Sequence, residues 1–373
     1  MTQQLLEESP AVPAGIRCID CDVHPQFPGH WADSLKPYMP EGWRTRFGGN
    51  GTPFSGYELP GVPYYGVPGG LFRLELLKAG GVPCSDPVKA AADLLDRNGI
   101  DRAIMMPQIS GAIGLFPDPT VATTIARALN DYFLEKWTGV DNRWRFVITV
   151  TPQDPDWSVK EIERLQGRPG VVGIHIPLNN TMMGTNTFYR IYEACEHYGL
   201  CVTIHLGVAG IYYTGMPAPG GPPVNWIDFR GTATYAHAAQ VSSLVCNGVF
   251  EMFPKLQVLM AEVGYGWLPD LMWRLDNSWK AARSTTPYLK RLPSEYIAGH
   301  IKLSTQPWVE PAKESQVPEL LDMMRAERTL VFSSDYPHWD GDDPLYIAGK
   351  IPEGIRQRVL VDNATEAFGD RIL

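Results

Sequence analysis

The 373-residue sequence lacks three features that would connect it to a membrane or to nucleic acid. No apolar run approaches the roughly 18 residues that a membrane-spanning helix needs, so no span is expected. There is no block of basic residues, and 32 Lys and Arg stand against 41 Asp and Glu, a net charge of −9. Because a phosphate backbone is bound chiefly by clustered cations, nucleic acid is not an expected partner.

Two further absences concern the compartment of the protein. The first 15 residues contain neither a basic segment nor an apolar stretch, so no signal peptide is expected. The six cysteines follow no disulfide-scaffold spacing, which favours reduced thiols. The sequence therefore predicts a cytoplasmic protein. The cysteines are at positions 18, 21, 84, 195, 201 and 246.

No glycine-rich nucleotide-binding fingerprint follows the first apolar run, which disfavours a doubly wound open sheet. What is present instead is an alternation of apolar, β-branched runs with amphipathic stretches. Eight strand candidates with helices between them predict parallel βαβ units closed into a (β/α)₈ barrel. The expected strands are 16–22, 102–108, 145–151, 171–177, 200–206, 256–262, 300–305 and 329–335. The expected helices are 87–98, 121–138, 156–165, 187–197, 232–253 and 267–282.

One long segment interrupts this alternation after the first strand. Residues 25–81 are rich in Gly, Pro, Trp and Tyr. Active sites of such barrels lie at the carboxyl ends of the strands, so the insertion is expected to cover that mouth as a lid. The alternative is an irregular surface excursion. The whole chain, residues 1–373, is predicted to be one barrel domain.

The strongest local indication of a functional site is the hexapeptide DCDVHP, which starts at Asp20. Alternate residues of a strand share a face, so Asp20, Asp22 and His24 are expected to point one way. A carboxylate and an imidazole two residues apart can reach one divalent cation. The alternative is a turn-capping aspartate beside a hydrogen-bonded histidine.

Four other predicted strands also end in a titratable residue. His175, His205, Glu262 and Asp335 are each expected at the same mouth of the barrel. The carboxylates would repel one another without a cation between them, which favours a metal site. Mixed nitrogen and oxygen ligands suit Zn²⁺, Mn²⁺ or Fe²⁺, and no pair of cysteines converges there to form a closed zinc site.

Two further histidines have open interpretations. His237 falls on an apolar helical stripe, which favours a buried core residue, but the predicted helix starts near Thr232 at the mouth and leaves a ligand role open. His338 follows the last strand and is expected either to contact a ligand residue or to bind the metal itself.

Four motifs together resemble a known family of enzymes. They resemble the amidohydrolase-related branch of the amidohydrolase superfamily, which includes aminocarboxymuconate-semialdehyde decarboxylase and γ-resorcylate decarboxylase. The resemblance covers about residues 16–370 and implies a metal-dependent (β/α)₈ barrel. The motifs are DCDVHP, TIHLG, LVCNGVFEMFPKLQVLMAEVGYGWLP and SSDYPHWDGDDP.

Carried over by position, the resemblance makes Asp22, His24 and His205 metal ligands. It implies that Asp335 binds the metal or handles a proton. The sequence departs from the decarboxylase pattern at Glu262, where relatives usually have a catalytic histidine, and at His175, where many relatives have no ligand. These departures add potential ligands, enough for a second ion, and we expect at least one of these two residues to touch a metal.

The sequence therefore favours an enzyme that acts on a small carboxylate or amide. The reaction is either hydrolysis or non-oxidative decarboxylation. Asp335, Glu262 and His338 are the expected catalytic residues, the last two as proton carriers. An alternative is an oxygenase with two Fe or Mn ions. A third is a metal-binding subunit paired with a paralogous barrel, and in either case a homo- or hetero-oligomer of barrels is expected.

Overall fold

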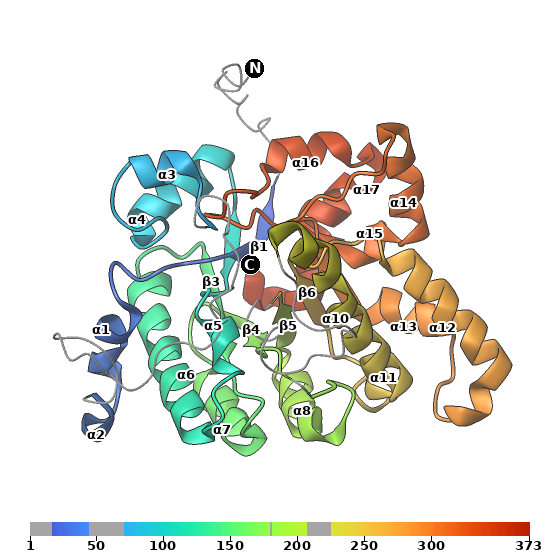
Figure 1. The fold of residues 1–373 in the computed structure, drawn as a ribbon, viewed down its shortest axis with the longest axis horizontal. Coiled ribbons are helices and arrows are strands. Elements are labelled where there is room, and N and C mark those ends of the chain that lie inside the picture. Colours follow the sequence, from blue (N-terminus) through green and yellow to red (C-terminus); the bar gives the residue numbers. More distant parts are fainter. Residues whose placement is uncertain (1–16, 45–70, 180, 207–224) are drawn as a thin grey trace.

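The computed structural model describes residues 17–44, 71–179, 181–206 and 225–373. Its centre is a sheet of eight parallel strands in sequence order, and helices surround these strands (Figure 1). The predicted (β/α)₈ barrel is therefore confirmed, and the open doubly wound sheet is excluded. The strands are β1 (Ile19–Val23), β2 (Arg102–Met105), β3 (Trp144–Thr149), β4 (Val171–His175), β5 (Cys201–His205), β6 (Val258–Ala261), β7 (Ile301–Ser304) and β8 (Leu330–Val331).

The helices occupy the connections between the strands and the segment after β8. Up to β5 they are α1 (Trp31–Leu35), α2 (Glu41–Arg44), α3 (Leu74–Lys78), α4 (Pro87–Ala90), α5 (Ser110–Ile113), α6 (Pro119–Phe133), α7 (Pro155–Leu165) and α8 (Tyr189–Tyr198). After β5 they are α10 (Trp226–Cys246), α11 (Val249–Met252), α12 (Leu268–Ala282), α13 (Pro293–His300), α14 (Val317–Met323), α15 (Ala326–Thr329), α16 (Pro344–Lys350), α17 (Glu353–Gln357) and α18 (Asn363–Phe368). None of these helices has the length and hydropathy required to cross a membrane.

Four of the helices begin at an Asp-Pro pair. The aspartate side chain accepts a hydrogen bond from a backbone N–H of the first turn, and the proline fixes a helical φ at the next position. The two residues together mark the start of each helix. The pairs are Asp86–Pro87 (α4), Asp118–Pro119 (α6), Asp154–Pro155 (α7) and Asp343–Pro344 (α16).

The barrel closes between its last and first strands through backbone hydrogen bonds. The amide of Cys21 donates to the carbonyl of Phe332 (3.0 Å), and the amide of Asp335 donates to the carbonyl of Asp22 (3.1 Å). Val23 forms a parallel bridge with Tyr336. This closure brings the residues after β8 against the carboxyl end of β1, where the polar motifs lie.

The regular alternation predicted for the first strand is broken. The register between β1 and β2 shifts between Asp20 and Val23, as in a β-bulge. The Asp20 carboxylate accepts hydrogen bonds from the amides of Asp22 (3.2 Å) and Ser334 (2.9 Å). Asp20 therefore holds the backbone of Asp22 and Ser334 in place. Asp20 is not among the side chains that could share an ion, and the shared face expected for Asp20, Asp22 and His24 stays a prediction.

The structure describes only part of the predicted insertion, residues 25–81. Its described residues form α1, α2 and α3, and residues 45–70 lie outside the described part of the chain. Its role as a lid stays a prediction.

Candidate metal centre

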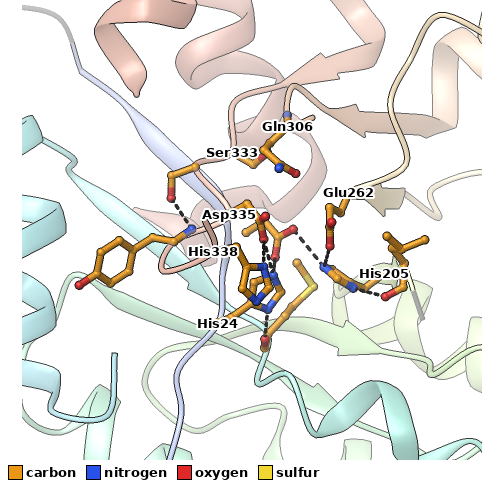
Figure 2. Close-up of polar contacts among 12 residues, drawn as sticks. His24, His205, Glu262, Gln306, Ser333, Asp335 and His338 are labelled. Carbon is orange, nitrogen blue, oxygen red and sulfur yellow. Dashed lines mark hydrogen bonds and ion pairs between the residues drawn. The ribbon is translucent and has the colours of Figure 1, made fainter. Parts of the chain in front are cut away.

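Six titratable side chains from four strand ends meet at the mouth of the barrel. Asp22 lies on β1 and His205 ends β5, while His24, Glu262, Asp335 and His338 follow β1, β6 and β8 directly. In Figure 2, the labelled members of this set point toward one another. Five of the six residues are buried, and the side chain of His205 is 13% exposed. The structure thus brings together every predicted site residue except His175.

Two of the imidazoles are held by backbone carbonyls. Nδ1 of His24 lies 2.7 Å from the carbonyl oxygen of Met106, and Nδ1 of His205 lies 2.6 Å from that of Leu206. In a neutral ring this contact places the proton on Nδ1 and leaves the lone pair on Nε2. Nε2 is therefore the atom that each ring presents to the centre, as in many metal-binding histidines.

The Asp22 carboxylate lies between these two rings. Its Oδ1 is 3.2 Å from Nε2 of His24, and its Oδ2 is 3.3 Å from Nε2 of His205. Burial lowers the pKa of both histidines, but neighbouring carboxylates, Asp22 foremost, outweigh burial and raise it. The carboxylates therefore favour positive charge at the centre, which a cation would supply.

Asp335 and His338 form the second part of the centre. Oδ1 of Asp335 accepts from Nδ1 of His338 at 2.7 Å and lies 2.9 Å from Nε2 of His24. Burial alone would lower the pKa of His338, yet Asp335 raises it to about 9. Burial would also raise the pKa of Asp335, but His338 and His24 hold it well below its usual range. The pair therefore carries opposite charges in the absence of a metal.

Glu262 enters the centre from β6 with an unusual backbone conformation. Its φ is +54°, and that of Asp335 is +57°, a region that non-glycine residues seldom adopt. The Ser304 hydroxyl accepts from the Glu262 amide at 2.8 Å and so stabilises the bend. Burial, reinforced by Asp335, raises the pKa of the Glu262 carboxyl to about 7.

Arg230 on α10 contacts the centre and was missed by the sequence analysis. Its Nη1 donates to Oε1 of Glu262 at 2.7 Å, and its Nη2 lies 3.0 Å from Oδ2 of Asp340. The other carboxylate oxygen of Glu262 lies 3.4 Å from Nε2 of His205. Arg230 thus occupies one oxygen and leaves the other facing the imidazoles. Its sequence neighbourhood contains no motif, so only the fold brings it to Glu262.

The described residues offer two groups of side chains that could hold a metal ion. One group is His24, Glu262, Asp335 and His338, and the other is Asp22, His24 and His205. In each group the ligand atoms lie within 4.8 Å of one another. Several of these atoms are buried without a hydrogen-bond partner: both oxygens of Asp22, Oδ2 of Asp335, and Nε2 of His24, His205 and His338. Such unpartnered lone pairs fit a divalent cation with nitrogen and oxygen ligands.

Two predicted candidates lie outside both groups. His175 is buried at the end of β4 but is not among the side chains that could share an ion. His237 is buried in α10, and its Nδ1 lies 3.2 Å from the carbonyl of Ala233. The predicted helix start near Thr232 was wrong, because the side chain of Asn225 caps the helix and α10 begins at Trp226. His237 is therefore well inside the helix, which favours the core interpretation. The direct metal contact predicted for Glu262 or His175 stays a prediction.

Known proteins resemble this chain over most of its length. Gamma-resorcylate decarboxylase of Polaromonas sp. (strain JS666 / ATCC BAA-500) is 25% identical over 295 residues, 74% of this chain and 85% of that protein. The enzyme of the same name from Rhodococcus jostii (strain RHA1) is 25% identical over 294 residues, with the same coverage.

Solved structures share the fold. An amidohydrolase from Mycobacterium avium subsp. paratuberculosis K-10 superimposes with a TM-score of 0.72 at 21% identity, covering 95% of this chain and all of that one. A dihydroxybenzoic acid decarboxylase from Polaromonas sp. JS666, with bound manganese and the inhibitor 2-nitroresorcinol, gives 0.63 at 19% identity, with coverages of 94% and 96%. The amidohydrolase family model matches residues 19–369. The chain therefore belongs to the amidohydrolase family, a family of enzymes.

Proposed function

We propose that this protein is a divalent-metal-dependent enzyme that decarboxylates a small hydroxylated aromatic acid without oxidation. The observation that carries the proposal is the set of buried, unpartnered nitrogen and oxygen atoms on Asp22, His24, His205 and Asp335. The similarity to gamma-resorcylate decarboxylases supports decarboxylation over hydrolysis. Manganese is the metal named with several structural neighbours, which makes it the first ion to test.

In this proposal, Asp22, His24, His205 and Asp335 hold the ion. The ion would supply a Lewis acid that binds and polarises an oxygen of the substrate. The backbone contacts of Met106 and Leu206 fix the two rings before any ion arrives. The centre is thus preorganised, which reduces the cost of binding.

Decarboxylation also requires a proton. The bond between the ring carbon and the carboxylate breaks, CO₂ leaves, and the same carbon takes up one proton. Glu262 is the candidate donor because one of its oxygens faces the imidazoles while Arg230 holds the other. His338, 2.7 Å from Asp335, is the second candidate. Both belong to the group that also contains His24 and Asp335, so each would border a small substrate held by an ion there.

The test is CO₂ release from 2,6-dihydroxybenzoate and 5-carboxyvanillate by protein reconstituted with Mn²⁺. We expect release by the loaded enzyme, and none after chelation or from the His205→Ala variant. An aryl amide supplied in parallel tests hydrolysis. Amide cleavage without CO₂ release from any hydroxylated aromatic acid would overturn the proposal.

A second candidate function rests on the two ligand groups, which share only His24. Two ions, one in each group, would suit activation of dioxygen rather than decarboxylation, with His24 binding only one of them because its ring presents a single lone pair. Titration of the metal-free protein with Mn²⁺ or Fe²⁺ separates the two candidates. One equivalent bound per chain supports the decarboxylase, whereas two equivalents together with substrate-dependent dioxygen uptake support the oxygenase.

A further inference from the structure

Three polar side chains form a row across neighbouring strands, one layer beneath His205. Thr149 of β3 is paired in register with His175 of β4, and His175 is paired with Thr203 of β5. Residues opposite one another in adjacent parallel strands point to the same side of the sheet. Thr203 precedes His205 by two residues in an unbroken stretch of β5, so the row faces the barrel interior.

The row is buried, its four polar side-chain atoms make no well-formed hydrogen bond, and the backbone of Thr203 contacts the His175 ring. Thr149 and Thr203 are 0% exposed and His175 is 1% exposed. The Thr149 and Thr203 hydroxyls and both ring nitrogens of His175 make no well-formed hydrogen bond. Buried polar atoms are nearly always hydrogen-bonded, and the interior of such a barrel is usually filled by branched aliphatic side chains. Four such atoms without a well-formed hydrogen bond in one row therefore indicate a ligand.

The chemistry of the row selects a small neutral ligand. Burial, together with the nearby His205 and His24, lowers the pKa of His175 to about 3, so its ring is neutral. A neutral imidazole offers one N–H and one lone pair, and each hydroxyl can donate or accept. The row contains no cation that would attract an anion, and His175 belongs to neither metal-competent group.

We propose that Thr149, His175 and Thr203 bind water beneath the metal ligands, and that this water and His175 relay protons to the centre. Internal waters typically make about three hydrogen bonds to buried polar groups that otherwise lack partners. The row supplies that number from three adjacent strands. Thr203 precedes His205 by two residues on the same face of β5, so water bound by the row would lie directly beneath this proposed ligand.

The relay deepens the proposed function, on which it rests, because each CO₂ released requires one proton. When the bound water passes a proton to one ring nitrogen of His175 and takes up a replacement proton from solvent, the other nitrogen releases its proton toward the centre. The ring remains neutral overall, and no charge is left in the barrel interior. His175 is then a positioning and relay residue, not a metal ligand.

Isosteric variants of the two threonines test the water site without any substrate. Valine keeps the volume of threonine and removes the hydroxyl. If water occupies the row, Thr149→Val and Thr203→Val should each lower the unfolding midpoint of the metal-free protein by about 1–2 °C. Thr329→Val is the matched control, since its hydroxyl donates to the Met324 carbonyl at 2.9 Å and its loss should also be destabilising. A rise in the midpoint for both row variants would show a dry row and overturn the proposal.

Variants of His175 test the relay. His175→Asn and His175→Phe should retain full metal content, lower the rate of CO₂ release by about 10- to 100-fold and increase its solvent deuterium isotope effect. Loss of an equivalent of metal would make His175 a ligand and overturn the relay, as would an unchanged rate. If the wild-type protein releases no CO₂ from any acid, the proposed function fails, while the midpoints of the threonine variants still decide whether the row binds water.

Discussion

At the scale of single residues, the backbone around each histidine decides what that histidine can do. The carbonyls of Met106 and Leu206 contact Nδ1 of His24 and His205 and direct Nε2 to the centre. His175 is different: the backbone of Thr203 contacts its ring without a well-formed hydrogen bond, and it lies outside both ligand groups. Three histidines at strand ends look equivalent in the sequence, yet their surroundings give them different chemistry.

The first prediction at this scale concerns His205. Replacing it with alanine removes one imidazole ligand but leaves the barrel core intact, because the side chain lies at the mouth. We expect the purified variant to fold and to lose most of its bound metal, a loss of about 10- to 100-fold in affinity or more. Metal content by elemental analysis and the circular dichroism spectrum provide the two readouts. A full complement of metal in the variant would remove His205 from the ligand set.

The second prediction concerns Glu262. Glutamine keeps the acceptor oxygen that Arg230 holds and removes the carboxylate that would carry a proton. CO₂ release by Glu262→Gln should fall by about 100-fold or more while substrate binding changes little. Asp340→Asn is the matched control, because Asp340 also contacts Arg230 but belongs to neither ligand group. Equal losses in the two variants would argue that only the position of Arg230 matters.

At the scale of elements, the strands were predictable to within a few residues, because apolar β-branched runs specify them. The prediction for the last strand was wrong at its carboxyl end. The strand was expected to run to Asp335, but β8 spans only Leu330–Val331. From Phe332 onward, partners outside the β-ladder bind the backbone. The Thr305 hydroxyl accepts from the Ser333 amide (3.0 Å), and the Asp20 carboxylate accepts from the Ser334 amide. A local pattern cannot reveal partners that distant segments supply.

The sequence contained an indication of α16, the helix after the last strand, which was not predicted. Asp343–Pro344 begins α16 with the same pair of residues that begins α4, α6 and α7. For the site, sequence spacing predicted which strand-end side chains lie close together, because each follows an apolar run. Arg230 lies in a helix with no motif and could be found only in three dimensions.

The prediction at the element scale concerns Asn130 of α6, which joins a helix to β3. Its amide nitrogen donates to the Thr149 carbonyl (3.0 Å), and its Oδ1 accepts from the Thr149 amide (2.8 Å). Asn130→Ala would leave both buried backbone groups unpartnered and should lower the free energy of unfolding by about 2–4 kcal/mol. Chemical denaturation measures this loss. Asn98→Ala removes one partly exposed contact with Leu94 and should cost less than about 1 kcal/mol. Similar losses in both variants would contradict the role of Asn130.

At the scale of the whole molecule, the polar side chains inside the barrel differ in role according to their distance from the mouth. The proposed metal ligands lie at the carboxyl ends of the strands, and the row of Thr149, His175 and Thr203 lies one layer below them. Near the amino end of β7, Lys302 is 3% exposed and donates to the carbonyl of Arg328. This distribution follows the general division of such barrels, with chemistry at one end and stability at the other.

The buried Lys302 makes the free energy of unfolding depend on pH. Burial lowers its pKa to about 8 in the folded protein, below its ordinary value of 10.5. Folding therefore disfavours the charged form, and the resulting cost is fully present below pH 8 and is relieved as the pH rises toward 10.5. Relative to Lys302→Met, the wild type should gain up to about 3 kcal/mol in unfolding free energy across that range. A difference between the two proteins that does not vary with pH would contradict the lowered pKa.

The central claim is that the side chains at the mouth bind a divalent cation. The most direct test is anomalous X-ray scattering at the manganese absorption edge, measured on crystals of the Mn²⁺-loaded protein. We predict a peak within bonding distance, about 2.0–2.3 Å, of Nε2 of His24, Nε2 of His205 and a carboxylate oxygen of Asp22 or Asp335. A loaded crystal with no anomalous peak in contact with these atoms would contradict the account.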